Sequence, residues 1–468
     1  MKIKQLNNEK RGDELKNQRS QYKLVYGMVL NPHDDKKCDF YRDGAILLES
    51  VSAKGIYVVK DLGDVSYINK KYSKLLQPLC KCEDEVEVVD LKDHVILPSF
   101  FDMHFHWVQD DVRLKSKASL LEWLSKYAWP CENKFKDKKF SKRVAKKFFN
   151  KLPSYGTLGG AIYSSIHEHA IHNAMENAIG DFIIGNVLMT INSPDYLVQT
   201  KEQALKLVKK LAQKYGKKYA VTPRFAPSTD PITMKKSAAI AKKHGSFIQS
   251  HLSENLKEID YVLSIYRGDY KEKGFKNVAT YTDIYKKVAV LSPKTLMAHA
   301  IYLSNKECQL LAKTKTALIH CPTSNAPVSE MGLSSGLFDF KKMERKNIRW
   351  ALGTDIGGGP FISMFDVMRS FVDQNRKKKR MSATYVKALY RATLAGAEIL
   401  NISKTNGNLA KKKYANFIAV KSPKSLSKSG KQNAEIVLKK IIETISSRDQ
   451  LENLVNYTFY KGNLFFKR

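Results

Sequence analysis

The stretch VILPSFFDMHFH, residues 95–106, decides the fold because it joins an apolar strand pattern to two closely spaced histidines. His104 and His106 stand two apart near its end, and side chains two apart on a strand point to the same face. Two imidazoles on one buried face are costly unless something engages both rings, and a metal ion does so. For either histidine alone, a core residue bonded to backbone would be the simpler interpretation.

Downstream of this stretch, short strand-like runs alternate with longer helical stretches, which is typical of βα units around a parallel sheet. Two of the helical stretches, residues 201–216 and 231–245, end at glycine, as helix C-termini often do. Eight repeats over about 300 residues suit an α/β fold of the (β/α)8 TIM-barrel type. The eight predicted strands are residues 95–105, 157–166, 181–189, 218–225, 246–253, 295–303, 316–322 and 348–355.

Both ends of the chain are β-rich. Short alternating apolar runs fill residues 21–97, and the pattern returns to β after about residue 400, in ANFIAVKS and LVNYTFYKGNLFFK. The simplest arrangement pairs the two ends in one small composite β-sandwich domain beside the barrel. We therefore predict three segments: residues 1–97 and 399–468 form the β-sandwich domain, and residues 98–398 form the barrel.

Other strand ends repeat the feature seen at His104 and His106. His251 ends the fifth predicted strand, His299 the sixth and Asp355 the eighth. Active sites of such barrels are built at the C-terminal ends of the strands. Three histidines and one aspartate, from strands one, five and eight, complete a nitrogen and oxygen shell suited to Zn²⁺ with one position left for water.

A competing cluster, SSIHEHAIHNA, contains His167, Glu168, His169 and His172. It follows the second strand in a turn and a helix start, where strand alternation is lost. We interpret it as a polar loop at the barrel mouth, and for His320, at the end of the seventh strand, we favour a packing role or one supporting the metal ligands. Zinc deaminases of the cytidine type are excluded, because the chain has neither H-x-E nor C-x-x-C.

Composition limits the remaining classes. The 468 residues are 43% hydrophobic, and the formal net charge is +34. Such a charge attracts polyanions, but no nucleic-acid-binding motif accompanies it, so we expect no specific nucleic-acid partner. Six cysteines without framework spacing, including the weak C-x-C pair Cys80 and Cys82, indicate a reducing compartment. With no signal-peptide pattern in residues 1–16 and no membrane-length apolar run, we expect a cytoplasmic protein without a membrane partner.

Several motifs resemble the amidohydrolase superfamily and, within it, the guanine deaminase family. LPSFFDMHFH resembles the superfamily pattern P-G-h-h-D-x-H-x-H, with Ser99 where glycine is usual. The narrower resemblance covers most of the barrel. Its motifs are SLLEWLSKYAWPCENKF (119–135), VTPRFAPS (221–228), IQSHLSEN (248–255), MAHAIYLS (297–304), HCPTSN (320–325) and LGTDIGGG (352–359).

The resemblance implies zinc-dependent hydrolytic deamination of guanine to xanthine and ammonia by a homodimer with one Zn²⁺ per chain. The implied metal ligands are His104, His106, His251 and Asp355. The implied catalytic residues are Glu254, as proton shuttle, with His299 and Asp355. The implied substrate contacts are Gln109, Arg224 and Phe225, together with His106, His251, Glu254 and Asp355. Trp107 and Val108 are bulkier than the small residues expected beside Gln109, which predicts a narrower pocket.

Three other functions compete with this interpretation. A related deaminase or chlorohydrolase acting on another purine, a pterin or a triazine-like ring would use the same metal set. A binuclear hydrolase would need a lysine at the end of strand four, where the sequence has Arg224 instead. A binding or scaffold protein could keep the fold without turnover, but the intact ligand set and Glu254 argue against it.

Overall fold

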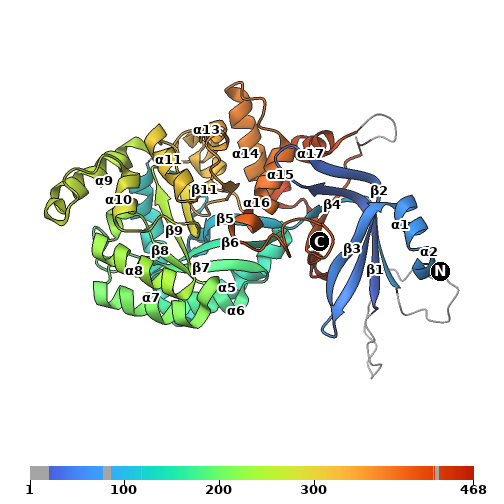
Figure 1. Cartoon of the computed structure of the whole chain (residues 1–468), viewed down its shortest axis with the longest axis horizontal. Helices are drawn as coiled ribbons and strands as arrows, with labels where there is room; N and C mark the ends of the chain where they lie inside the picture. Colours follow the sequence, from blue (N-terminus) through green and yellow to red (C-terminus); the bar gives the residue numbers. More distant parts are fainter. Residues whose placement is uncertain (1–19, 77–85, 118, 425, 427–431) are drawn as a thin grey trace.

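The computed structural model describes residues 20–76, 86–117, 119–424, 426 and 432–468. Two of the predictions above concern residues outside these ranges, namely the Cys80 and Cys82 pair and residues 1–16. The chain forms a barrel with a separate β-sheet beside it (Figure 1). Within the described part of the chain, no helix combines the length and the apolar character needed to cross a membrane.

The barrel consists of eight parallel strands in sequential order, so the fold predicted from the sequence is confirmed. Backbone hydrogen bonds from Asp355 N to His104 O (2.7 Å) and from His106 N to Ile356 O (2.5 Å) join the last strand to the first. The strands are β5 (Phe100–His106), β6 (Thr157–Ser164), β7 (Asp181–Leu188), β8 (Ala220–Pro223), β9 (Phe247–Leu252), β10 (Thr295–His299), β11 (Ala317–His320) and β12 (Trp350–Leu352).

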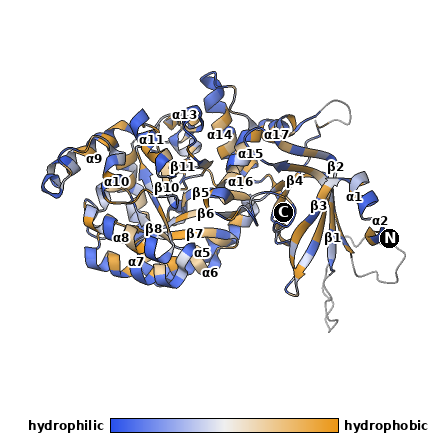
Figure 2. Cartoon of the chain, in the orientation of Figure 1, coloured by the Kyte–Doolittle hydropathy of each residue, from blue (hydrophilic) through white to orange (hydrophobic). Residues whose placement is uncertain are grey.

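Helices surround the barrel, with their hydrophilic residues turned outward (Figure 2). The caps of α8 illustrate why they start and stop where they do: Asp230 accepts from the backbone of Ile232 and Thr233, and Gly245 ends the helix in a left-handed conformation. The helices are α1 (Val65–Lys71), α2 (Ser73–Leu76), α3 (Leu120–Trp123), α4 (Trp129–Asn133), α5 (Lys138–Lys151), α6 (Glu168–Asn177), α7 (Lys201–Tyr215), α8 (Pro231–His244), α9 (Leu256–Gly268), α10 (Tyr281–Lys287), α11 (Asn305–Lys313), α12 (Pro322–Asn325), α13 (Phe340–Arg345), α14 (Met364–Lys377), α15 (Tyr385–Ala392), α16 (Leu394–Ile399), α17 (Ala434–Glu443) and α18 (Arg448–Glu452).

The second sheet contains strands from both chain ends, as predicted. Its order is β15-β14-β13-β4-β1-β2-β3, and the central pairing of β13 with β4 joins the C-terminal segment to the N-terminal one. The sheet curls so that Tyr57 N on β3 donates to Lys461 O beyond β14 at 3.0 Å. Its strands are β1 (Tyr22–Pro32), β2 (Cys38–Ser52), β3 (Ile56–Asp64), β4 (Val86–Pro98), β13 (Phe417–Lys421), β14 (Val455–Tyr460) and β15 (Asn463–Lys467).

The domain boundaries after residues 97 and 398 stay predictions. In the structure β4 ends at Pro98 and β5 begins at Phe100, while α16 ends at Ile399.

One end of the barrel is filled by apolar side chains, which leaves the other end for chemistry. Phe101 and Met103 of β5 point into a small interior cluster that also contains residues of α16. A Cβ at Gly396 of α16 would lie 2.6 Å from the Cβ of Phe101, so only glycine allows the helix to approach this closely. The polar site therefore lies toward the strands' C-terminal ends.

Candidate functional site

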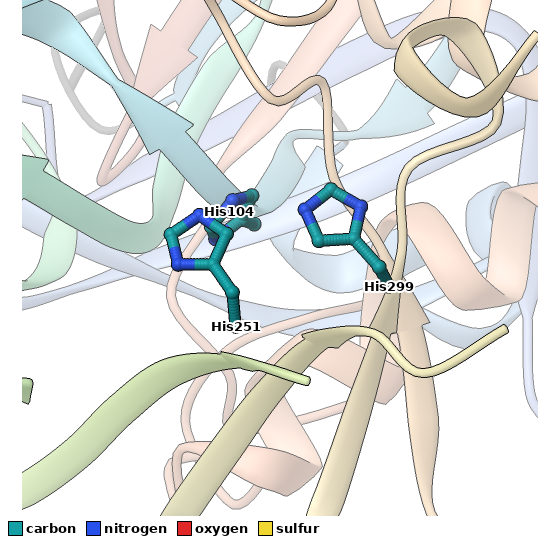
Figure 3. A group of neighbouring side chains, drawn as sticks. All are labelled: His104, His251 and His299. Carbon is teal, nitrogen blue, oxygen red and sulfur yellow. The ribbon is translucent and has the colours of Figure 1, made fainter. Parts of the chain in front are cut away.

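Five of the predicted polar residues converge at the C-terminal ends of the barrel strands. His104 and His106 lie on β5, His251 on β9 and His299 at the end of β10, while Asp355 follows β12. Figure 3 shows the rings of His104, His251 and His299 grouped within the barrel. Four of the five residues are buried, and His251 is partly exposed, so the cluster is largely shielded from bulk water.

The distances within this cluster match those between ligands of one metal ion. The Nε2 atoms of His106 and His251 lie 3.3 Å apart. Asp355 Oδ1 lies 3.2 Å from His104 Nε2 and 3.7 Å from His106 Nε2. Ligands held about 2.0–2.1 Å from a tetrahedral zinc ion would be about 3.3–3.4 Å apart. Two groups of ligand atoms lie within 4.8 Å of one another, His104 with His106 and Asp355, and His104 with His251 and His299, so the cluster could hold such an ion.

The protonation of the cluster also suits a cation. Burial lowers the pKa of His104, His106 and His251, which keeps their rings neutral and able to donate lone pairs. Burial alone would raise the pKa of Asp355, but the neighbouring His104 and His299 rings outweigh it and hold that pKa well below its ordinary value. The buried His104 Nε2 lies 3.2 Å from Asp355 Oδ1 but forms a well-aligned hydrogen bond neither with it nor with any other described residue. A divalent metal ion would satisfy all of these groups at once.

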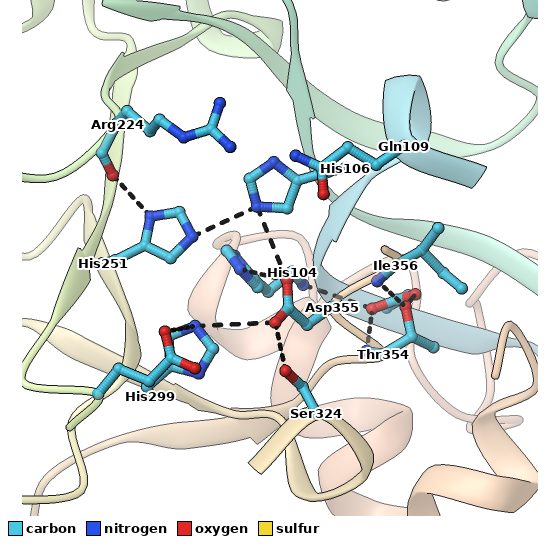
Figure 4. A network of polar contacts seen from close by, with 12 residues as sticks. His104, His106, Gln109, Arg224, His251, His299, Ser324, Thr354, Asp355 and Ile356 are labelled. Atoms are coloured by element: carbon cyan, nitrogen blue, oxygen red, sulfur yellow. Dashed lines mark hydrogen bonds and ion pairs between the residues drawn. The ribbon is translucent and has the colours of Figure 1, made fainter. Parts of the chain in front are cut away.

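Contacts outside the cluster fix the orientation of its members (Figure 4). His251 Nδ1 lies 2.6 Å from the carbonyl oxygen of Arg224, which fixes the tautomer that leaves Nε2 free to face the cluster. Ser324 Oγ donates to Asp355 Oδ2 at 2.7 Å. These supporting contacts follow the pattern by which metal sites orient their ligands, and the sequence interpretation had not assigned Ser324 a role.

Asp102 is a second supporting residue that the sequence interpretation missed. Its buried carboxylate accepts from Thr354 N at 2.9 Å and Thr354 Oγ1 at 2.5 Å, and thereby ties β5 to the segment that carries Asp355. The residue lies in the same D-x-H-x-H run as His104 and His106, and that position was the available signal, although the register of β5 shifts between Asp102 and Phe105.

Glu254 and His299 lie side by side next to the cluster. His299 Nε2 is 3.6 Å from Glu254 Oε2 and 3.9 Å from Asp355 Oδ2. Ser335 Oγ donates to Glu254 Oε1 at 2.8 Å, and burial raises the pKa of Glu254 above its ordinary value. His299 (φ 69°) and Asp355 (φ 52°) adopt left-handed backbone conformations, which are uncommon outside glycine and cluster at functional sites.

A cavity opens beside these groups. Gln109, Arg224 and Phe225, the three predicted substrate contacts, all line it. Trp123 and Leu333 belong to an apolar cluster that also includes Phe225, and both line the cavity. The cavity therefore has a polar wall at the strand ends and an apolar wall above, which suits a flat ring with polar edges.

Behind the polar wall lies Glu132 of α4, which the sequence interpretation did not single out. Arg224 Nη1 donates to both of its carboxylate oxygens, at 2.7 and 2.8 Å, and Gln109 Nε2 donates to Oε1 at 2.5 Å. The Glu132 side chain is fully buried. A glutamate within the apolar-rich run WPCENKF was the available signal, but only the fold shows that it meets Arg224, 92 residues away.

The competing histidine cluster does not form a metal site. His169 Nε2 contacts the carbonyl oxygen of Phe135 at 2.6 Å. His172 contacts Tyr215 through Nδ1 and Glu168 through Nε2. His167 precedes α6 and stacks on His169. Glu168, His169 and His172 lie on α6 itself, so the polar-loop interpretation is wrong for these three residues. None of the histidines lines the cavity described above.

Two further expectations concern buried rings. His320 stacks on Phe338 with ring centroids 4.8 Å apart, and burial lowers its pKa to about 3, so it packs in the core as favoured. The expectation that Trp107 and Val108 narrow the pocket is wrong. Both are buried in the outer core, where the Trp107 ring packs edge-on against Phe135 at 4.8 Å. Both lie on the short 3₁₀ helix that begins at Trp107, and neither lines the cavity.

Comparison with known proteins agrees with this geometry. The profile of the amidohydrolase family matches residues 95–461. Guanine deaminase of Dictyostelium discoideum is 33% identical over 340 residues, which cover 69% of this chain and 72% of that protein. Guanine deaminase of Escherichia coli is 29% identical over 395 residues, covering 82% and 86%. A crystal structure of guanine deaminase from C. acetobutylicum with bound guanine has a TM-score of 0.78 and 23% identity, covering 95% and 100%. The chain therefore belongs to the amidohydrolase family, among the guanine deaminases.

Proposed function

We propose that this protein hydrolyses guanine to xanthine and ammonia. The observation that carries the proposal is the pairing, within one cavity, of a cluster suited to a metal ion with a wall of buried polar side chains, Arg224 and Gln109, suited to the edge of an oxo-purine. The family supports a hydrolase, and the guanine deaminase relatives support this ring among the many that the family's fold could hold.

We further propose that one Zn²⁺ is held by His104, His106, His251 and Asp355. Three neutral imidazoles and one carboxylate are the ligands that zinc takes in hydrolytic sites. When bound, zinc acidifies the water at its open position, so that hydroxide is available near neutral pH.

In the proposed reaction, Glu254 takes a proton from the attacking water and delivers it to the ring nitrogen N3 as the C2–O bond forms. The burial that raises its pKa makes the carboxyl group suited to both accepting and releasing a proton. His299 and Asp355 stabilise the tetrahedral carbon that results. A second proton transfer, from the new C2 hydroxyl to the exocyclic nitrogen, allows the C2–N bond to break as the C2 carbonyl forms, which releases ammonia and leaves xanthine.

The substrate would be held by its opposite edge and its face. The Arg224 guanidinium donates to the C6 carbonyl, while the Phe225 ring packs on the purine. Adenine presents an amino group at C6, which leaves the buried donors of Arg224 without an acceptor. Each unpaired buried polar group costs about 1–3 kcal/mol, so the site favours guanine by roughly 5- to 150-fold for each such mismatch.

The test is ammonia release by the purified, zinc-loaded protein across a panel of guanine, adenine, cytosine, S-adenosylhomocysteine, a pterin and a triazine. We expect turnover of guanine to exceed that of every other ring. Absent turnover of guanine, with brisk turnover of another ring, would refute the proposal. The homodimer and the cytoplasmic location stay predictions; light scattering of the eluted protein would test the first and fractionation of source cells the second.

A further inference from the structure

Glu132 lies behind the two residues that we propose to read the purine edge. It has no exposed surface, and three hydrogen bonds reach its two oxygens, two from Arg224 Nη1 and one from Gln109 Nε2. The residues of the metal cluster take no part in these three hydrogen bonds. Its influence on the site must therefore pass through the two side chains that it holds.

The hydrogen bond between Glu132 and Gln109 determines the orientation of the Gln109 side-chain amide. A carboxylate only accepts hydrogen bonds, so the amide must turn its NH₂ group to Glu132. The carbonyl oxygen Oε1 is then the free end. It is buried and has no hydrogen-bond partner among the described residues, although Gln109 lines the cavity.

Arg224 is held in a complementary way. Both of its bonds to Glu132 use Nη1, and no described residue accepts from Nη2. Figure 4 shows Gln109 and the Arg224 guanidinium facing each other across the site. The wall thus offers an arginine donor beside an amide acceptor, and Glu132 fixes that order.

We propose that Glu132 is a positioning residue that makes the cavity selective for a lactam edge, in which a carbonyl lies next to a ring N–H. This inference rests on the function proposed above. In guanine the C6 carbonyl accepts from Arg224, and N1–H donates to Gln109 Oε1. A ring whose N1 carries only a lone pair places two acceptors face to face and is rejected.

The discriminating substrate pair is guanine and 2-aminopurine. Both carry the amino group at C2, but 2-aminopurine lacks the C6 carbonyl and has an unprotonated N1. In a Glu132→Gln variant the Gln109 amide is free to rotate and donate to N1. We expect kcat/KM for guanine to fall at least tenfold and kcat/KM for 2-aminopurine to rise at least threefold relative to wild type.

Glu122→Gln on the neighbouring helix α3 is the matched control. It removes the same charge from an exposed side chain and should leave both values within twofold of wild type. If Glu132 only supports the fold, both substrates lose efficiency by a similar factor in Glu132→Gln. Any outcome in which 2-aminopurine does not gain overturns the inference.

A second variant keeps the test decisive if Glu132→Gln fails to fold. Gln109→Met leaves Glu132 paired with Arg224 and removes only the amide. If Oε1 faces the substrate, guanine loses at least tenfold while 2-aminopurine gains; if the NH₂ group faces it, 2-aminopurine loses instead and the inference is wrong. Failure of the wild-type protein to turn over guanine would refute the proposed function itself, which separates the two results.

Discussion

Replacing Glu254 with glutamine tests the proposed proton transfer with little disturbance of the site. Glutamine has the same shape, and its carbonyl oxygen can still accept the 2.8 Å hydrogen bond from Ser335 Oγ. The backbone N–H of residue 254, which donates to Glu258 Oε2, is unaffected. We therefore expect the free energy of unfolding to change by less than about 1 kcal/mol, as for an exchange that leaves buried hydrogen bonds in place.

Activity should respond very differently. Glu254 Oε2 lies 3.6 Å from His299 Nε2 inside a site from which bulk water is excluded, and the amide cannot carry a proton between water and the ring. A positioned general base contributes about 10²- to 10⁴-fold in rate, which corresponds to about 3–5.5 kcal/mol of barrier. The variant should therefore lose at least a hundredfold in kcat while retaining its zinc, because Glu254 is not among the proposed ligands.

The assay combines steady-state xanthine formation, zinc content by atomic absorption and thermal unfolding. Glu307→Gln serves as a control, because Glu307 is a buried glutamate whose side chain accepts from Ser304 at the start of α11 and from Thr282, neither of which belongs to the site. A Glu254→Gln variant with kcat within tenfold of wild type would refute the proton-transfer role. Loss of zinc together with activity would instead place Glu254 among the metal ligands.

Three further changes probe the metal, the barrel closure and the β-sheet domain. Dialysis against a chelator should abolish turnover and lower the melting temperature, because metal at a thousandfold its Kd stabilises the folded state by about 4 kcal/mol; an unchanged melting temperature would contradict the assigned ligands. Asp102→Ala should destabilise the protein by about 2–4 kcal/mol in urea unfolding, since two buried Thr354 donors lose their acceptor, and a loss below 1 kcal/mol would count against this clamp. Asp61 is buried, which alone would raise its pKa, but bonds from Lys71, Lys411 and other donors lower that pKa to about 2. Because the folded-state pKa is depressed, Asp61→Asn should cost about 1–2 kcal/mol at pH 5–7, and the difference should vanish as pH falls from about 4 towards 2; a constant difference would contradict the pairing.

The barrel and its principal polar residues were predictable because they follow local rules. Strand alternation places His104 and His106 on one face, and strand ends in a parallel barrel meet at one rim, so His251 and Asp355 fall beside them. The β-rich chain ends likewise predicted a composite sheet. Helix α17, which lies between β13 and β14 in the sequence and packs against α15, was not anticipated. The narrowing predicted from Trp107 was wrong because this side chain, at the start of the 3₁₀ helix that follows β5, packs in the apolar core and does not line the cavity.

Local sequence patterns were enough to predict the type of fold and the chemical types of the residues around a metal site, because period-two alternation and strand-end placement are set by backbone geometry over a few residues. Tertiary structure alone decided which carboxylate stands behind the substrate wall. Glu132 meets Arg224 and Gln109 only because α4 packs against the 3₁₀ helix that follows β5, and a hydrogen bond between residues 92 positions apart leaves no periodic trace in the chain. The same contact sets the direction of the Gln109 amide, because a carboxylate can only accept.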